Sequence, residues 1–296
     1  MGIDQIVRCV LIFGAPSSIE DYYQQIGRAG RDTEPAETVL FFQYKNIVIG
    51  KHMCSKKSDI MSKDVIDNKK RLIKVFGKNY LNPLGLSVPG DPSSAAFFVA
   101  LTLLNYNSYL KIKNVGVNST RSGFYRLLKK HGAKIKFEKV KKKNNEPVGN
   151  IIARSCKLSP IKASKNYYVN STDEYPILFV IAALTKGISI FKGIKDLANK
   201  ESNRIKEMQN IFKQIGIKSV SSKNELKIFG KGIIDASDRK IIVRNLGDHR
   251  ICMSSFILAI LTGAKTKIKN FETVNTSSPS FLKIMKSLGV KFEKKN

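Results

Sequence analysis

Three strongly apolar segments alternate with polar ones in the second part of the chain, and each follows an aspartate. The aspartates are Asp91, Asp173 and Asp248. The segments are AAFFVALTLL (95–104), PILFVIAAL (176–184) and ICMSSFILAIL (251–261). Each is apolar on every side at helical spacing, which is typical of a helix buried in a protein core. The pattern therefore predicts three buried helices, each beginning just after an aspartate.

The same order of elements follows each aspartate, at the same spacing. A short strand-like segment comes first, at 109–115, 187–194 and 266–271. A polar triplet comes next: Asn118-Ser119-Thr120, Lys200-Glu201-Ser202 and Asn275-Thr276-Ser277. A helix with one apolar side follows, ended by Gly132, Gly216 or Gly289, and a further strand is expected after each glycine. The order predicts an α/β lobe of three internal repeats around buried helices.

Charged residues gather at one end of this predicted lobe. If a pseudo-threefold axis relates the repeats, the helix starts and the polar triplets meet there, and helix starts favour anions. The charged residues at these points are Asp173, Lys200, Glu201, Arg204, Asp248, His249 and Arg250. Two arginines and a lysine beside acids predict an anion site with an acid/base pair next to it.

Each of these residues also has a purely structural interpretation. Asp91 and Asp248 are favoured as helix caps, worth roughly 1 kcal/mol each. Glu201 and Arg204 are spaced as a surface pair worth a few tenths of a kcal/mol. His249 is favoured as a packed or hydrogen-bonded residue rather than a catalyst. The functional interpretation depends on the whole group lying together.

Five motifs in the second part of the chain resemble EPSP synthase (3-phosphoshikimate 1-carboxyvinyltransferase). They are VPGDPSSAA (88–96), NSTR (118–121), TDEYP (172–176), KESNR (200–204) and DHRICM (248–253). They occur in the order of the family, and residues 86–296 resemble its C-terminal lobe. The resemblance implies an inside-out α/β barrel lobe of three repeats, the enolpyruvyl transferase fold, which agrees with the repeat pattern.

The resemblance also implies a reaction, transfer of the enolpyruvyl group of phosphoenolpyruvate to the 5-hydroxyl of shikimate 3-phosphate in aromatic amino acid biosynthesis. By motif, Asp173 is the base facing the 5-hydroxyl, and Glu201 handles the proton at the methylene carbon of phosphoenolpyruvate. Lys200 contacts shikimate phosphate or its hydroxyl network, and Arg204 and Arg250 bind phosphoenolpyruvate. The family implies no metal and no organic cofactor.

Several features depart from the family pattern. Asn203 stands where the family usually has aspartate, and Ala198-Asn199 replace the usual Arg-Val. The motifs of the family's other lobe, which complete the substrate site, are not identifiable. We therefore expect an incomplete enzyme without independent activity. A UDP-N-acetylglucosamine-type enolpyruvyl transferase is the nearest alternative, but the Lys-Glu-Ser and Asp-His-Arg motifs favour the shikimate enzyme.

The beginning of the chain has a different pattern. Apolar segments at 6–13 and 38–44 flank a polar helical stretch and the sequence QQIGRAGRD (24–32). These features predict strand, helix, strand, with Arg28 and Arg31 placed to reach phosphate oxygens. QQIGRAGRD resembles motif VI of RecQ-type superfamily 2 DNA helicases, with MGID (1–4) in the place of motif V and APSS (15–18) between the two motifs.

The helicase resemblance covers residues 1–45 only. It implies contact of Arg28 and Arg31 with ATP, or contact of this segment with DNA, only together with a missing lobe. The chain has no G-x-x-x-x-G-K-[ST] loop to bind the nucleotide. Two alternatives to the synthase hypothesis therefore remain, a RecQ-like helicase fragment and an inactive chimeric or truncated reading frame.

Residues 46–85 carry a helical apolar pattern followed by helix-breaking residues. The pattern is made by Ile60, Val65, Ile66, Leu72, Ile73 and Phe76. It predicts a helical tail and linker. The predicted domains are thus 1–45, the helicase-like fragment, 46–85, the tail, and 86–296, the synthase-like lobe.

Composition and net charge exclude only a few classes of function. The formal net charge is +29, carried mostly by dispersed lysines, which favours attraction of small anions over specific nucleic-acid recognition. Four separated cysteines without a CxxC pair predict neither a zinc site nor a disulfide framework. No apolar run is long enough for a membrane span, so we expect a cytoplasmic protein.

Overall fold

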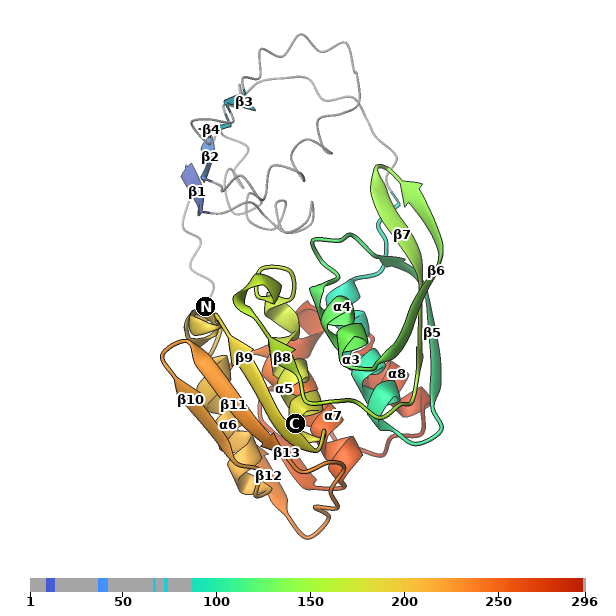
Figure 1. Cartoon of the computed structure of the whole chain (residues 1–296), viewed down its shortest axis with the longest axis vertical. Coiled ribbons are helices and arrows are strands. Elements are labelled where there is room, and N and C mark those ends of the chain that lie inside the picture. The colour runs from blue at the N-terminus through green and yellow to red at the C-terminus, as the bar shows by residue number, and fades with distance from the viewer. Residues whose placement is uncertain (1–8, 14–36, 42–65, 68–71, 74–86, 295–296) are drawn as a thin grey trace. The chain divides into compact units, whose positions relative to one another are not determined.

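The computed structural model describes residues 87–294 in full and, before them, the backbone of residues 9–13, 37–41, 66–67 and 72–73. The chain divides into two compact units, Met1–Ser87 and Val88–Asn296. Figure 1 shows the helices and strands of both. No helix among the described residues is long and apolar enough to cross a membrane.

The first unit contains both strands predicted around the QQIGRAGRD segment. β1 (Cys9–Phe13) pairs in parallel with β2 (Glu37–Phe41). Parallel neighbours need a crossover connection, which agrees with the predicted order of strand, helix and strand. Arg28 and Arg31 lie outside the described residues, so their predicted phosphate contacts remain predictions.

The prediction of helix within residues 46–85 is wrong where the backbone is described. β3 (Ile66–Asp67) and β4 (Leu72–Ile73) are short antiparallel strands, and Leu72 pairs with Phe41 of β2. Each strand contains a β-branched isoleucine, which favours extended backbone. Pairing with a neighbouring strand outweighs the apolar spacing that indicated a helix.

Three helices form the centre of the second unit, as the apolar segments predict. They are α3 (Pro92–Leu104), α5 (Tyr175–Ala183) and α7 (His249–Thr262), and they pack against one another in all three pairs. Every residue of α5 is buried. A helix without a polar side has no surface to show to water, so the three can only pack inward.

Three sheets accompany these helices (Figure 1). The first, antiparallel, has the order β5 (Tyr109–Gly116), β7 (Glu146–Arg154), β6 (Lys134–Lys143). The second has the order β10 (Ser219–Ser222), β11 (Glu225–Gly230), β9 (Gly187–Lys192), β8 (Lys162–Ala163). The third is the parallel pair β12 (Lys240–Val243) and β13 (Lys265–Ile268). The strands predicted after the central helices are thus found as β5, β9 and β13.

The second, amphipathic helices occur where the sequence places them. They are α4 (Gly123–Lys130), α6 (Arg204–Gln214) and α8 (Phe281–Ser287). The predicted apolar face of α6 is buried: Ile205, Met208, Ile211, Phe212 and, just after the helix, Ile215. Residues 290–294 form no strand, so the strand expected after α8 is absent from the described part of the chain.

Glycine ends these helices for a conformational reason. Gly132, Gly216 and Gly289 have φ angles of 95°, 71° and 85°. A side chain strains the backbone in this left-handed region, and glycine does not. The three predicted helix ends are confirmed.

Candidate functional site

The starts of α3 and α7 are capped by the aspartates that precede them. The Asp91 carboxylate accepts hydrogen bonds from the backbone N–H groups of Ser93 and Ser94 at 3.1 and 2.8 Å. The Asp248 carboxylate accepts from Arg250 and Ile251 at 3.0 and 3.4 Å. The structural interpretation of Asp91 and Asp248 as helix caps is therefore confirmed.

Asp173 differs from the other two aspartates. It lies in a 3₁₀ turn, η3 (Thr172–Glu174), directly before α5, and the N-cap residue of α5 is Glu174, whose side chain makes no capping bond. The Asp173 side chain is 40% exposed. Its carboxylate is thus free of the backbone and available to the arginines of the neighbouring elements.

Arg204, the first residue of α6, joins three acidic groups. Its Nε donates to Oδ2 of Asp248 at 2.9 Å, and its Nη2 donates to Oε2 of Glu201 at 2.6 Å. Its Nη1 lies 3.5 Å from Oδ1 of Asp173. The Arg204 side chain is only 1% exposed, and Asp248 is fully buried. Arg204 is therefore the buried, charge-paired centre of the site. The alternative interpretation of Glu201 and Arg204 as a surface ion pair does not describe this burial.

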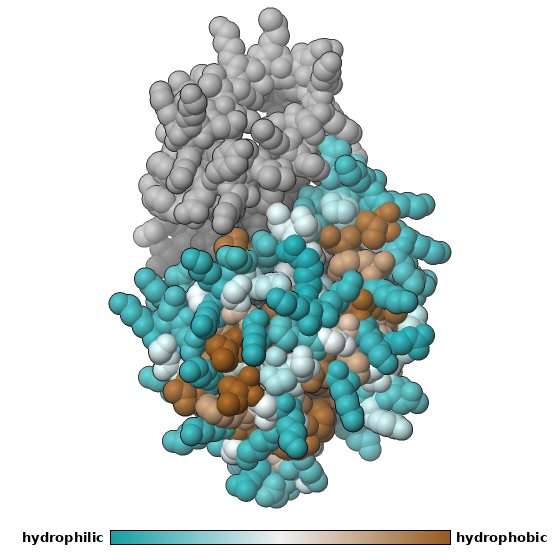
Figure 2. All heavy atoms as spheres, in the orientation of Figure 1, coloured by the Kyte–Doolittle hydropathy of each residue, from teal (hydrophilic) through white to brown (hydrophobic). Residues whose placement is uncertain are grey.

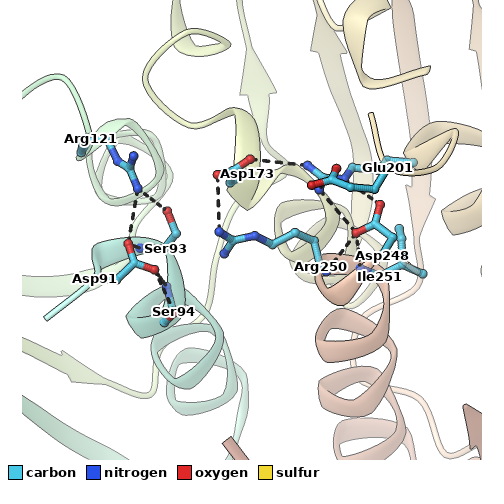
Figure 3. A network of polar contacts seen from close by, with 10 residues as sticks. Asp91, Ser93, Ser94, Arg121, Asp173, Glu201, Asp248, Arg250 and Ile251 are labelled. Carbon is cyan, nitrogen blue, oxygen red and sulfur yellow. Dashed lines mark hydrogen bonds and ion pairs between the residues drawn. The ribbon is translucent and has the colours of Figure 1, made fainter. Parts of the chain in front are cut away.

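Arg250 links the start of α7 to Asp173 (Figure 3). Its Nη2 donates to Oδ2 of Asp173 at 3.4 Å, and its side chain is 7% exposed. Asp173 therefore lies between two guanidinium groups that come from different helices. The backbone bond to Asp248 fixes the root of Arg250 at the same helix start.

Three guanidinium nitrogens of the two arginines donate no hydrogen bond within the described part of the chain. They are Nη1 of Arg204 and both Nε and Nη1 of Arg250, and all are buried. A buried donor without an acceptor costs free energy, and a guanidinium group pairs best with carboxylate or phosphate oxygens. The arrangement therefore fits a small anion beside Asp173.

Lys200 and Glu201 border this centre from the turn before α6. Lys200 follows the 3₁₀ turn η4 (Lys195–Asn199) and is exposed. Its charge lowers the pKa of Asp173 together with the arginines. The Glu201 side chain is 46% exposed. The structure thus brings together Asp173, Glu201, Arg204 and Arg250, with Lys200 at the edge.

Charge decides the protonation of the two central aspartates. Burial by itself raises the pKa of Asp173, but Arg250 and Arg204 outweigh it, and the pKa lies below its ordinary value. Burial likewise opposes ionisation of Asp248, and Arg204 and the hydroxyl of Ser202 lower its pKa overall. Both aspartates are ionised at neutral pH, so Asp173 is in the form that can accept a proton.

His249 is held neutral beside this group. Burial, followed by the positive charge of Arg250, lowers its pKa below 6.5. A neutral imidazole adds no charge to the anion site at neutral pH. The interpretation of His249 as a structural residue stays a prediction.

The residues that depart from the family pattern around KESNR (200–204) lie at and before the start of α6. Asn203 is the N-cap residue, and its side-chain oxygen accepts from the backbone N–H of Lys206 at 3.0 Å. Asparagine caps a helix about as well as aspartate. The capping geometry is therefore kept, while one negative charge near Arg204 is missing. Ala198 and Asn199 end the preceding 3₁₀ turn.

Two residues near this centre, Glu174 and Arg121, have no role predicted from the sequence. Glu174 is 4% exposed, and burial followed by the negative charge of Asp173 raises the pKa of its carboxyl group to about 7. Arg121 donates from Nη2 to Ser93 Oγ at 3.2 Å and to Asp91 Oδ1 at 3.3 Å. An acid at the entrance of an otherwise apolar helix is the signal that could have identified Glu174.

Comparison with known proteins places the chain in one family. The family described as EPSP synthase (3-phosphoshikimate 1-carboxyvinyltransferase) matches residues 59–285. This match begins inside the segment 46–85 that the sequence indicated as a tail and linker. The proposed site residues, from Asp173 to Arg250, all lie within it.

Curated relatives agree with this match. A 3-phosphoshikimate 1-carboxyvinyltransferase of Zymomonas mobilis is 35% identical over 226 residues, which are 75% of this chain and 50% of that protein. The protein of the same name from Petrotoga mobilis is 37% identical over 201 residues, 68% of this chain and 46% of that one. The chain spans about half the length of the curated relatives it matches.

Solved structures show the same likeness. An EPSP synthase from Acinetobacter baumannii superposes with a TM-score of 0.71 at 26% identity, covering 96% of this chain and 63% of that one. The enolpyruvyl transferase NikO from Streptomyces tendae shares the fold at 13% identity, with a TM-score of 0.52 over 67% of this chain and 43% of that one. These findings give no support to the helicase resemblance of residues 1–45.

Proposed function

The chain belongs to the EPSP synthase family, and we propose that its second unit forms one side of an enolpyruvyl transfer site for phosphoenolpyruvate and shikimate 3-phosphate. The single observation that carries this proposal is the pair Arg204 and Arg250, which reach Asp173 from two helices and keep three buried guanidinium nitrogens without a hydrogen bond to any described residue. That pair fits the carboxylate or phosphate of phosphoenolpyruvate.

The proposed roles follow from position and charge. Asp173, ionised and partly exposed, accepts the proton of the shikimate 5-hydroxyl as the oxygen attacks phosphoenolpyruvate. Glu201, also partly exposed, exchanges the proton at the methylene carbon of phosphoenolpyruvate. Lys200 at the edge of the site binds the phosphate or hydroxyl groups of the shikimate substrate. The two arginines neutralise the charge of the tetrahedral intermediate before phosphate leaves.

The proposal includes a finer description of the fold and domains. The second unit is taken as an inside-out α/β barrel lobe of three repeats, with residues 1–45 and 46–85 as separate segments before residue 86. The pairwise packing of α3, α5 and α7 supports the threefold arrangement. Because the chain spans half of its relatives, the groups of the opposite wall of the site are proposed to come from outside the second unit. Turnover by the second unit alone is therefore not expected.

Ligand binding tests this proposal directly. Phosphoenolpyruvate at about millimolar concentration is expected to shift the backbone amide NMR signals of residues 200–204, since ordinary substrate affinities lie at or below this range. Arg250→Ala should abolish the shifts, because the variant loses one of the two guanidinium groups. Arg239→Ala, at an arginine that is 61% exposed and pairs only with Asp238 among the contacts described, is the matched control.

A complementation assay tests the reaction itself. The full chain is mixed with the N-terminal half of the Zymomonas mobilis relative, and phosphate release is followed with both substrates present. Activity that appears only in the mixture, and disappears with Asp173→Asn, supports the proposed base. Absence of amide shifts with phosphoenolpyruvate in the unaltered chain would overturn the proposed function.

A further inference from the structure

Ser202 connects the turn before α6 to the start of α7 through its side chain. Its hydroxyl group donates to Oδ2 of Asp248 at 2.9 Å, a contact between residues that are far apart in the sequence. Ser202 is half-buried, whereas Asp248 is fully buried. The proposed reaction assigns no part to Ser202, so the purpose of this hydrogen bond has to be found in what Asp248 itself holds.

The two oxygens of the Asp248 carboxylate have different sets of donors. Oδ1 accepts from the backbone N–H groups of Arg250 and Ile251 at 3.0 and 3.4 Å, which is the cap of α7. Oδ2 accepts from the Ser202 hydroxyl and from Nε of Arg204, both at 2.9 Å. The last side-chain torsion of an aspartate is broad. Donors on both oxygens are therefore needed to hold the carboxylate at one angle.

The angle of this carboxylate decides where the Arg204 guanidinium group points. Nε of Arg204 donates to Oδ2 of Asp248 at 2.9 Å, and Nη2 donates to Oδ1 at 3.4 Å, so one edge of the group follows the carboxylate. A guanidinium group is planar and rigid, so fixing that edge also fixes Nη1. Nη1 lies 3.5 Å from Oδ1 of Asp173 and donates no hydrogen bond to any described residue. It is the nitrogen of Arg204 that remains for an anion.

We propose that Ser202 is a positioning residue for the anion site: by holding Oδ2 of Asp248, it sets the plane of the Arg204 guanidinium group and the direction of Nη1 beside Asp173. Arg204 already supplies the positive charge that pairs with Asp248, so the hydroxyl of Ser202 adds direction to the pair and no charge. This inference rests on the proposed function, because the anion beside Asp173 is phosphoenolpyruvate only within that proposal.

Capping of α6 does not account for the Ser202 hydroxyl. The N-cap residue of α6 is Asn203, whose side-chain oxygen accepts from the backbone N–H of Lys206 at 3.0 Å. Ser202 precedes this cap and donates to another helix start instead. Its removal therefore leaves the caps of both α6 and α7 in place. Variants of Asp248 would lose the α7 cap, so Ser202 is the residue to alter in a test.

The first experiment measures the motion of the Arg204 Nε–H group by ¹⁵N NMR relaxation in the ligand-free full chain. In the unaltered chain its order parameter should be close to about 0.85, the value of a rigid group, and Ser202→Ala should lower it toward about 0.6. Ser202→Thr keeps a hydroxyl group and should restore the rigid value. The Nε–H group of exposed Arg239, which pairs with Asp238 at 3.2 Å, should not change in either variant.

The second experiment measures phosphoenolpyruvate affinity by isothermal titration calorimetry. Ser202→Ala should weaken binding about fivefold, because Nη1 of Arg204 loses its fixed direction, and Ser202→Thr should stay within about twofold of the unaltered chain. The matched control is Ser221→Ala on β10. It removes another hydrogen bond between side chains, from Ser221 to Gln209 at 3.0 Å, and should leave the affinity unchanged. A loss of stability alone would not produce rescue by threonine together with motion confined to Arg204.

The outcomes separate this inference from the proposed function. The positioning role is wrong if Ser202→Ala leaves the Arg204 order parameter unchanged, or if it weakens phosphoenolpyruvate binding no more than Ser221→Ala does. It is also wrong if Ser202→Thr binds as weakly as Ser202→Ala, since the hydroxyl group would then not be the cause. If the unaltered chain does not bind phosphoenolpyruvate, the proposed function fails, while the ligand-free relaxation measurement still decides whether Ser202 orients Arg204.

Discussion

The starts of α3 and α7 use the same two residue types in different surroundings. Each begins after an aspartate that caps the helix, and each aspartate contacts an arginine from outside its own helix: Asp91 with Arg121, and Asp248 with Arg204. At α3 the two side chains are 40% and 19% exposed, and at α7 they are 0% and 1% exposed. Figure 3 shows Asp91 with Arg121 on one side and Asp248 on the other, with Asp173 between them.

Because the two ion pairs differ in burial, the loss of one partner has a different effect on stability in each. Water screens the ion pair at the start of α3, so the removal of one of its two side chains leaves no buried charge without compensation. The α7 pair is out of reach of water, and loss of the acid would leave a guanidinium charge in the interior. The pair that costs most to disturb is also the one that adjoins the proposed anion site. The difference predicts how strongly each helix start responds to the same substitution.

The largest effect is expected from Asp248→Ala. The variant loses the α7 cap and leaves Arg204 with Glu201 and Asp173, at 2.6 and 3.5 Å, as its acidic partners among the described residues. Breaking a buried ion pair by removing one partner costs roughly 3–5 kcal/mol. Urea denaturation followed by circular dichroism should show a loss in the free energy of unfolding of this size.

The control for that variant is Asp238→Ala. Asp238 also pairs with an arginine, Arg239, at 3.2 Å, but the two side chains are 73% and 61% exposed. The free energy of unfolding should change by about 0.5 kcal/mol or less. Equal losses in the two variants would contradict the claim that burial, and not pairing itself, sets the cost.

The pH dependence of stability should differ when Glu174 is replaced by glutamine. The folded pKa of about 7 lies above the ordinary value of 4.5. A raised folded pKa gives stability that is complete below the unfolded pKa and is lost as pH rises through the folded one. The unaltered chain should therefore lose on the order of 2–3 kcal/mol between about pH 4 and pH 8 relative to Glu174→Gln.

The comparison between the two proteins isolates Glu174. Asp173 and Asp248 have lowered pKa values and titrate at more acidic pH than Glu174. The measured quantity is the difference in free energy of unfolding between Glu174→Gln and the unaltered chain at each pH. A difference that stays constant from about pH 4 to pH 8 would exclude a raised pKa for Glu174.

Apolar periodicity predicted most of the second unit because burial follows directly from it. The all-apolar segments gave α3, α5 and α7, and glycine placement gave the ends of α4, α6 and α8. Periodicity was wrong around β3 and β4, where short apolar groups fit a strand as well as a helix. Such groups are decided by pairing with distant residues, which spacing does not contain.

The sequence predicted which charged residues lie together at the site, but not how deeply they are buried. The repeat pattern indicated that Asp173, Glu201, Arg204 and Arg250 meet, and they do. It did not indicate that Arg204 is almost completely buried, since the spacing of Glu201 and Arg204 equally describes a surface pair. Hydrophilic side chains cover much of the face in Figure 2. Burial of a particular charge depends on the three-dimensional packing of three helices.

The smallest effect concerns the exposed member of the comparison, Asp91. Asp91→Ala removes two backbone hydrogen bonds at the start of α3 and should lower the free energy of unfolding by roughly 1 kcal/mol. Asp91→Asn keeps an oxygen acceptor for the cap but loses the charge that faces Arg121, so it should change stability by only a few tenths of a kcal/mol. Urea denaturation at low and at high salt separates the two contributions, because salt screens the ion pair and not the cap. If Asp91→Asn lowers the free energy of unfolding as much as Asp91→Ala does, the exposed ion pair contributes as much as the buried one. The contrast between α3 and α7 would then have a cause other than burial.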